Sequence, residues 1–267
     1  MEQSKAFPLI RSLLIGTGIV LLVLAVAFVS GVESALALWP WQSGNLSYTF
    51  VASIFAAIGT PVLWMGLTGD LAAMRAGALD FAMTYLGLTL VLLLPQAATV
   101  VDITPFLIFT SVSLLFNLLL YGWARQFAFK DQRPVPGLLR WSFLVFMVVL
   151  VGVGISLITL QPHVFPWPLK QQTSIVFGWI FLGAAVYFLH GFIYPVWSNV
   201  CGQLLGFLAY DLVLLIPFIR HFDAVKPEHY LSLTTYTAVI SYSALLSLYY
   251  LLLNPGPRLF HGDTRPR

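Results

Sequence analysis

The amino-acid sequence predicts an all-α fold, a polytopic transmembrane bundle of eight helices arranged as two parallel four-helix repeats. Three observations lead to this prediction. Hydrophobic residues make up 59% of the 267 positions and charged residues 9%, whereas soluble domains have about 45–50% and about 25%. The few charges separate long uncharged runs. A set of glycine, proline and aromatic landmarks also recurs in the same order in the two halves of the chain.

The uncharged runs are long enough for helices of about 20 residues, the length that crosses the hydrocarbon core of a bilayer. Five runs have 21 to 29 residues, and two longer runs also contain turns, which we place at Pro40 and near Pro195. Because the runs are continuous rather than alternating, a β-barrel is excluded. The predicted helices lie near residues 12–31, 47–66, 76–95, 105–123, 139–160, 174–193, 199–219 and 230–253.

The distribution of basic residues predicts the orientation of these helices. With both termini in the cytoplasm, ten lysines and arginines fall in cytoplasmic segments and three in external ones, as the positive-inside rule requires. We therefore expect a multi-pass protein of the cytoplasmic membrane, in contact with the lipid bilayer. The ten cytoplasmic residues are Lys5, Arg11, Arg75, Arg125, Lys130, Arg133, Arg140, Arg258, Arg265 and Arg267, and the three external ones are Lys170, Arg220 and Lys226.

The first apolar run, which precedes Ala35-Leu36-Ala37, has some features of a signal peptide with its cleavage site. It is longer than the apolar core of such a peptide, so we expect it to be retained as the first helix. The net charge of +3 is carried mainly by the tails and the central loop. This charge follows from membrane topology, and we expect no nucleic-acid partner.

The recurring landmarks divide the chain into two four-helix repeats at residues 1–126 and 139–254, with a cytoplasmic linker at 127–138 and a cytoplasmic tail at 255–267. Each repeat has an even number of spans, so both copies enter the membrane in the same direction. The matched landmarks are Gly16-Thr17-Gly18 with Gly152-Val153-Gly154, Trp39-Pro40-Trp41 with Phe165-Pro166-Trp167-Pro168, Ser47 with Ser174, Gly77 to Phe81 with Gly202 to Phe207, Pro95 with Pro217, Asp102 with Asp223, and Pro105 with Pro227.

The paired Trp39-Pro40-Trp41 and Phe165-Pro166-Trp167-Pro168 segments resemble those of uncharacterised bacterial multi-pass membrane proteins. The resemblance implies a multi-pass helical fold and no activity. On physical grounds, the tryptophans of these segments are typical of the aromatic belt at the membrane surface.

Asp211 is the residue that most strongly indicates a functional site. It lies about twelve residues into the predicted seventh helix, roughly 18 Å from its cytoplasmic end, and an acid at such a depth marks a site by default. Its neighbour Tyr210 aligns with Tyr85 in the first repeat, whereas Asp211 aligns with Leu86. Counting inward along the predicted eighth helix places three hydroxyl residues near the depth of Asp211, namely Thr234, Tyr236 and Thr237.

Two interpretations of this polar region remain open. Hydroxyl groups in adjacent helices can serve as packing contacts, worth about 0.6 kcal/mol each. In that case we expect a non-enzymatic scaffold or binding subunit that packs against a membrane-protein partner or a second copy of the chain. The alternative is a small-solute or proton-coupled transporter that uses Asp211 at the interface between the repeats.

Other residue types give no catalytic, cofactor or metal site. His190 is the only histidine within a predicted span, and Cys201 is the only cysteine, so paired ligands for haem or a metal cluster are missing. Asp80 could form an aspartate dyad with Asp211, but the predicted third helix places it only about 6 Å inside the membrane. We therefore expect no enzyme activity and no cofactor.

Overall fold

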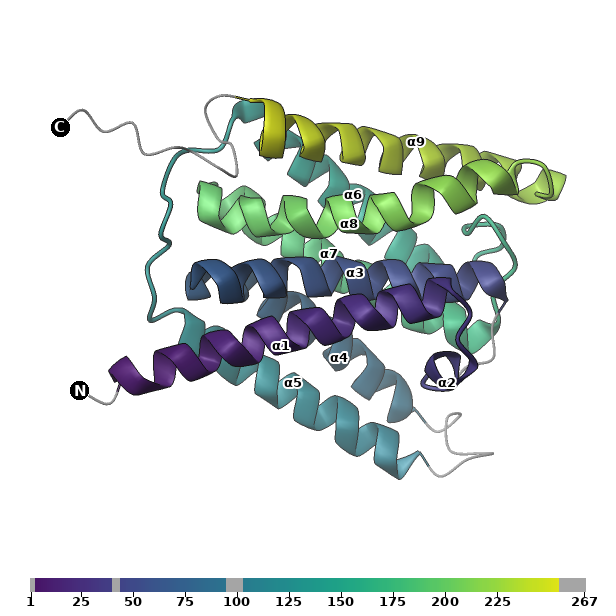
Figure 1. The fold of residues 1–267 in the computed structure, drawn as a ribbon. Helices are drawn as coiled ribbons and strands as arrows, with labels where there is room; N and C mark the ends of the chain where they lie inside the picture. The colour runs from purple at the N-terminus through teal and green to yellow at the C-terminus, as the bar shows by residue number, and fades with distance from the viewer. Residues whose placement is uncertain (1–2, 40–43, 95–102, 255–267) are drawn as a thin grey trace. The chain divides into compact units, whose positions relative to one another are not determined.

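The computed structural model describes residues 3–39, 44–94 and 103–254, and these residues are mostly helical (Figure 1). Among them, eight helices are long and apolar enough to cross a membrane, as the sequence predicts. Short α2 (Glu33–Leu36) and η3 (Pro227–His229) lie outside the long helices. The long helices are α1 (Gln3–Val29), α3 (Asn45–Thr68), α4 (Met74–Leu92, preceded by η1 at Leu71–Ala73), α5 (Thr104–Ala124), α6 (Gly137–Ile158), α7 (Gln171–Ile193), α8 (Trp197–His221) and α9 (Tyr230–Leu248, continued by η4 at Tyr249–Leu253).

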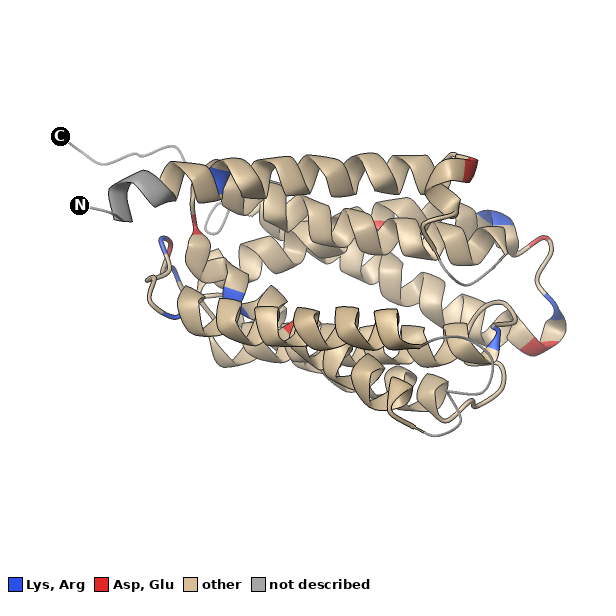
Figure 2. Ribbon diagram, turned by 90° about the horizontal axis from the view of Figure 1, so that it is seen from below, with Lys and Arg blue, Asp and Glu red and all other residues tan. Residues whose placement is uncertain are grey.

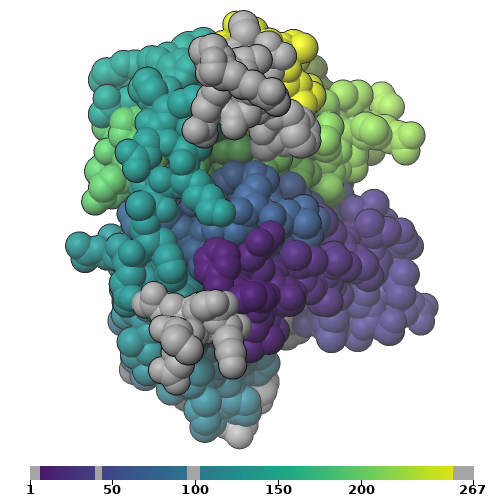
Figure 3. All heavy atoms as spheres, turned by 60° about the vertical axis from the view of Figure 1, so that its left-hand side comes forward, coloured from purple at the N-terminus to yellow at the C-terminus, as the bar shows by residue number. Residues whose placement is uncertain are grey.

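The first helix begins well before the predicted start at residue 12, because Arg11 does not end it. The Arg11 side chain reaches the end of α3, where Nε donates to the carbonyl of Gly66 at 2.9 Å and a terminal nitrogen donates to that of Leu67 at 2.6 Å. These carbonyls lie at a helix C-terminus, where they lack partners within their own helix and attract a cation. Figure 3 shows the purple start of α1 against the blue end of α3.

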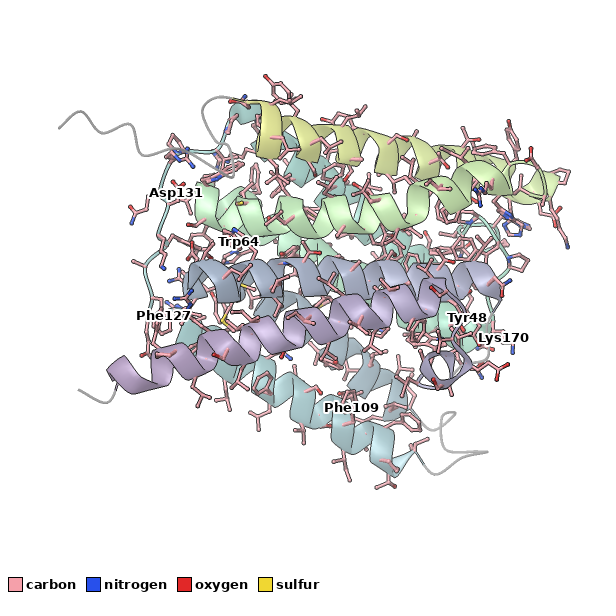
Figure 4. All side chains as sticks on the ribbon, viewed as in Figure 1. Tyr48, Trp64, Phe109, Phe127, Asp131 and Lys170 are labelled. Carbon is pink, nitrogen blue, oxygen red and sulfur yellow. The ribbon has the colours of Figure 1, made fainter. Side chains whose placement is uncertain are left out.

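The helices form two compact units, and each is described by itself. In unit 1 they pack in the order α1, α3, α8 and α9, with each helix against the next. Close approach depends on glycine, since a Cβ on Gly18 would lie 2.7 Å from the backbone nitrogen of Leu63. Trp64 of α3 lies beside α8, where a Cβ on Gly202 would come 3.4 Å from its ring (Figure 4).

Unit 1 also contains a short segment of the central loop, Asp131–Val135, which is bound to the start of α8. The backbone N–H of Trp197 donates to the carbonyl of Arg133 at 2.9 Å, and that of Ser198 donates to the carbonyl of Asp131 at 3.0 Å. The first N–H groups of a helix have no partner within it, and this segment supplies acceptors for two of them. An ion pair between Arg133 and Asp131 holds the segment together.

In unit 2 the helices pack in the order α5, α4, α7 and α6. Here too, glycines occupy the places where helices approach closely. A Cβ on Gly154 of α6 would lie 2.9 Å from the carbonyl oxygen of Gly178 on α7, and a Cβ on Gly87 of α4 would overlap the ring of Trp179. The packing of this unit therefore has no room for even one added methyl group at these positions.

The packing units do not follow the two halves of the chain. Each unit takes two helices from the first four and two from the last four. The division at 1–126 and 139–254 is thus a prediction about repetition in the sequence and does not describe which helices pack together.

Apolar side chains cover the outward faces of both units. On α1 and α5, bulky aliphatic and aromatic residues are more than 40% exposed, an arrangement that suits contact with hydrocarbon and not with water. Charged residues lie mainly at helix ends and in loops (Figure 2). Examples of the exposed apolar residues are Leu13, Val20, Val23 and Val26 on α1, and Phe109, Val112, Phe116 and Leu119 on α5.

Candidate functional site

Asp211 lies in the interior of unit 1, on the buried face of α8. It follows the first residue of α8 by 14 positions, about 21 Å along the helix, and only 1% of its surface is exposed. Among the described residues, neither of its carboxylate oxygens has a hydrogen-bond partner at ordinary geometry. The Ser243 hydroxyl on α9 is the side chain close enough to interact with the carboxyl group. An acid buried with so few polar contacts is costly unless it is neutral or binds a cation.

The spacing of residues on α9 explains why Ser243 faces α8. Positions 3 or 4 apart lie on one helical face, and Leu233, Ile240, Ser243 and Ser247 are all nearly fully buried at such spacing. The hydroxyls of both serines are buried without a hydrogen-bond partner among the residues that the structure describes. Of these two hydroxyls, that of Ser243 interacts with the Asp211 carboxyl group.

Two tyrosines next to Asp211 are hydrogen-bonded to each other. The hydroxyl of Tyr210 on α8 lies against that of Tyr236 on α9. The ring of Tyr210 contacts the ring of Phe50 on α3 edge to face, with centroids 6.0 Å apart, and Tyr236 contacts Phe218 at 5.2 Å. The tyrosine pair therefore links three helices of unit 1 around the position of Asp211.

The structure brings together some of the predicted site residues and separates others. Tyr210 and Tyr236 are in contact, and the buried Thr237 hydroxyl lacks a partner within the described residues. Thr234, in contrast, is exposed and donates its hydroxyl to the carbonyl of Tyr230 at 2.9 Å on its own helix. It is therefore not part of the polar cluster around Asp211.

Ser243 is the residue that counting along the sequence missed. The sequence predicts that the helix of Asp211 ends near residue 219, whereas α8 continues to His221. In addition, Phe218 packs on Tyr236, so Asp211, seven residues before Phe218, lies level with Ser243, seven residues after Tyr236. The matching depth on α9 is then further along that helix, beyond Thr237. A usable signal was present, since Tyr236, Ile240, Ser243 and Ser247 recur at the spacing of one helical face.

Asp80 lies deeper in its helix than the sequence predicts. The third span begins at Leu71 and not near residue 76, so Asp80 lies nine residues inside it, about 14 Å along the helix. Its carboxyl group interacts with the hydroxyl of Thr84 in unit 2. Asp80 is thus a second acid within a span.

In the described segments, no group of three or more His, Cys, Asp and Glu side chains could hold a metal ion. His190 is buried at the end of α7 with its ring 4.7 Å from that of Tyr194. Cys201 is buried near the start of α8.

No protein-family model matches this chain, and neither a curated protein nor a solved structure is significantly similar to it. The resemblance based on the paired tryptophan and proline segments therefore stays a prediction. The buried acids and the helix packing are the features from which function can be inferred.

Proposed function

We propose that the chain is a multi-pass protein of the cytoplasmic membrane that carries a small solute or protons, with Asp211 as the carboxyl group that takes up and releases a proton. The single observation that carries this proposal is the burial of Asp211 with no hydrogen bond of ordinary geometry to either oxygen, within the part of the chain described. An ionised acid in hydrocarbon is costly, and acids at such depth are typical of ion and proton pathways.

The scaffold or binding-subunit interpretation receives less support from the same observation. An acid kept for packing should have its oxygens capped by donors from neighbouring helices, because an uncapped polar group lowers stability. The hydroxyl of Ser243, which lies beside Asp211, is itself buried without a partner among the described residues. This arrangement favours a site that a proton or a small cation completes.

The helix packing supports a duplicated architecture. If α1, α3, α4 and α5 form the first repeat and α6, α7, α8 and α9 the second, the contacts of the two units correspond. The pair α1 and α3 corresponds to α6 and α7, the pair α3 and α8 to α7 and α4, and the pair α8 and α9 to α4 and α5. Exchanging each helix for its repeat partner thus converts the packing order of one unit into that of the other.

The glycines of the first helix in each proposed repeat have the same environments. Gly16 and Gly152 have open space where a Cβ would lie, whereas Gly18 and Gly154 are against the next helix. The first glycine of each Gly-x-Gly sequence therefore faces outward, and the second provides the close approach. This match in three dimensions supports the alignment made from the sequence.

Arginine caps also recur in the two proposed repeats. Arg11 of α1 donates to carbonyls at the end of α3, and Arg140 of α6 donates to the carbonyl of Phe192 at the end of α7 at 3.1 Å. In both cases a cation from the first helix meets the negative end of the second helix dipole. The same end of each helix pair is therefore basic, in keeping with the proposed cytoplasmic orientation.

In unit 1 the proposed repeats meet where α3 packs against α8, and Phe50 contacts Tyr210 there. Asp211 is about 21 Å from the start of α8 and about 15 Å from its end, which is near the middle of the span. Transporters built from repeats hold their substrates at such contacts near mid-membrane. The position of Asp211 is therefore suited to an exchanging carboxyl group.

Proton flux in proteoliposomes tests this proposal. Wild-type protein and Asp211→Asn are reconstituted with an entrapped pH-sensitive dye, a pH gradient is imposed, and choline, alanine and glucose are added in turn as probe solutes. We expect proton flux above that of empty liposomes with the wild type and a loss of at least tenfold with Asp211→Asn, because the amide cannot exchange a proton at neutral pH.

The matched control is Glu228→Gln, the same change of acid to amide at an exposed residue before α9, and its flux should equal that of the wild type. Asp211→Asn that retains wild-type flux excludes the proton role of Asp211. Wild-type protein that conducts no more than empty liposomes with all probes favours the scaffold interpretation.

A further inference from the structure

A second acid, Asp80, lies at a close crossing of α4 and α7 in unit 2. Gly183 of α7 packs directly on it, since a Cβ at this glycine would lie 2.6 Å from the backbone carbonyl oxygen of Asp80 and would also overlap the Asp80 carboxyl and the Thr84 hydroxyl. Gly183 is buried. Any other residue at 183 would therefore displace the acid or separate the helices.

The corresponding crossing in unit 1 has its glycine on the opposite helix. There α8 packs on α3, and a Cβ on Gly206 of α8 would lie 2.6 Å from the carbonyl oxygen of Ala57 on α3. By the alignment of Tyr85 with Tyr210, Asp80 corresponds to Leu205, next to this glycine. In unit 2 the glycine is supplied by α7, and the space it leaves is occupied by the carboxyl and hydroxyl groups of α4. Both glycines make a close crossing, but only Gly183 makes it around an acid.

The hydrogen-bond arrangement at this crossing depends on a proton on Asp80. A threonine hydroxyl has one proton to donate and two lone pairs that accept. Thr84 donates that proton to the carbonyl of Trp179 on α7 at 3.4 Å and also interacts with the Asp80 carboxyl. While the bond to Trp179 is made, the hydroxyl oxygen is left to accept from Asp80. A carboxylate cannot donate, whereas a carboxylic acid can.

The charges around Asp80 agree with a neutral acid. Within the described segments, the one ion pair joins Arg133 to Asp131 in unit 1. No lysine or arginine of these segments therefore forms an ion pair with Asp80. The titratable groups nearest the crossing are Tyr85, which interacts with Ser113 of α5, and Tyr187 and His190, one and two turns beyond Gly183 on α7. The cation of α4 is Arg75, and it donates to the carbonyls of Ala124 and Phe127. None of these groups forms an ion pair with the Asp80 carboxyl group within the described residues, and an uncompensated carboxylate in a span is costly.

We propose that Asp80 is a proton-binding site, in which the protonated carboxyl group donates to the Thr84 hydroxyl and this hydroxyl donates to the Trp179 carbonyl. The chain then holds two exchangeable protons within its spans, one on Asp211 in unit 1 and one on Asp80 in unit 2. The Asp80 site does not depend on transport or on Asp211, because its geometry lies entirely within unit 2.

Infrared spectroscopy of the purified full-length protein in lipid nanodiscs tests the site directly, since a protonated carboxylic acid has a carbonyl band that a carboxylate lacks. Spectra are compared at neutral pH between wild type and Asp80→Asn, which is isosteric. We expect Asp80→Asn to remove one component of the protonated-acid band. Thr84→Val, which keeps the shape but removes the acceptor, should shift that component to higher frequency.

The control is Glu228→Gln, an exposed acid that should leave the protonated-acid band unchanged. An unchanged protonated-acid band in Asp80→Asn, or a loss from the carboxylate bands instead, overturns the proposal. If Asp80→Asn does not fold, Thr84→Val provides the test. A protonated-acid band that stays at the wild-type frequency in this variant shows that Asp80 does not donate to Thr84 and overturns the proposal. Asp211→Asn should remove a different component, so failure of the flux assay and failure of the Asp80 site are separately visible.

Discussion

Replacing Gly18 with alanine should destabilise the packing of α1 on α3. A Cβ at this position would lie 2.7 Å from the backbone nitrogen and 2.8 Å from the Cα of Leu63. These are backbone atoms, so a side-chain rotation cannot relieve the overlap. Ordinary van der Waals contact begins near 3.4 Å. To lengthen the contact from 2.7 to 3.4 Å, the two helices must separate by about 0.7 Å at this point.

Separation of this size loses close contacts along both helices, and overpacking of a tight core costs about 1–3 kcal/mol. Alanine also favours helix over glycine by about 1 kcal/mol, which offsets part of this cost. The matched control is Gly16→Ala on the same helix, where nothing lies within 4 Å of the new Cβ. Gly16→Ala has the same gain in helix propensity but no overlap with α3. The free energies of unfolding of Gly18→Ala and Gly16→Ala should therefore differ by about 1–3 kcal/mol.

The measurement is reversible unfolding in mixed micelles with increasing dodecyl sulfate, followed by tryptophan fluorescence. The pair Gly154→Ala and Gly152→Ala repeats the comparison on α6, where a Cβ on Gly154 would lie 2.9 Å from the carbonyl oxygen of Gly178 and Gly152 has open space. Equal stability of Gly18→Ala and Gly16→Ala would refute the packing argument. A difference on α1 with none on α6 would refute the correspondence of the two helices.

Two further predictions concern the Arg11 cap on α3 and the orientation of the helices in the membrane. Arg11→Gln should lower the free energy of unfolding by about 1 kcal/mol, because the carbonyls of Gly66 and Leu67 lose charged donors. The free energy of unfolding of Arg11→Lys should lie between those of Arg11→Gln and the wild type in the same assay. Lysine keeps the positive charge but lacks the planar guanidinium group that donates to two carbonyls. Protease tags after Lys130 and after His163 should be cut from the cytoplasmic and the external side respectively, in right-side-out and inverted vesicles, and cleavage of the first tag from outside would reverse the orientation.

The positions of the spans could be predicted well from the sequence, because the hydrocarbon core sets both the length and the polarity of a helix. The ends were less predictable where a charged residue finds a partner inside the fold. The charge of Arg11 predicts a boundary of the first helix, but its side chain caps α3 and the helix continues through it. Helix ends therefore depend on tertiary contacts that hydropathy does not record.

The candidate site could be predicted only in part. The depth of Asp211 and its neighbour Tyr210 follow from one helix, whereas the partner on α9 depends on the register between two antiparallel helices. The two-residue error at the end of α8 and the unknown register between the helices together favour Thr234, which is exposed, over Ser243, which is buried. For Asp80, the significance of its position became visible only with the glycine of α7 packed on it, and no pattern within the third span shows that contact.

The interleaved composition of the two units has a consequence for biosynthesis. The hairpin of α1 and α3 is inserted first, but its packing partners α8 and α9 are the last of the described helices to leave the ribosome. During translation this hairpin therefore stays in the bilayer with the face of α3 around Ala57 and Pro61 not yet covered by Gly206 of α8, where other nascent membrane proteins can compete for it. Severing the gene at the central loop would leave each fragment with two hairpins that lack their packing partners, and the two units would assemble only when both fragments are made in the same cell.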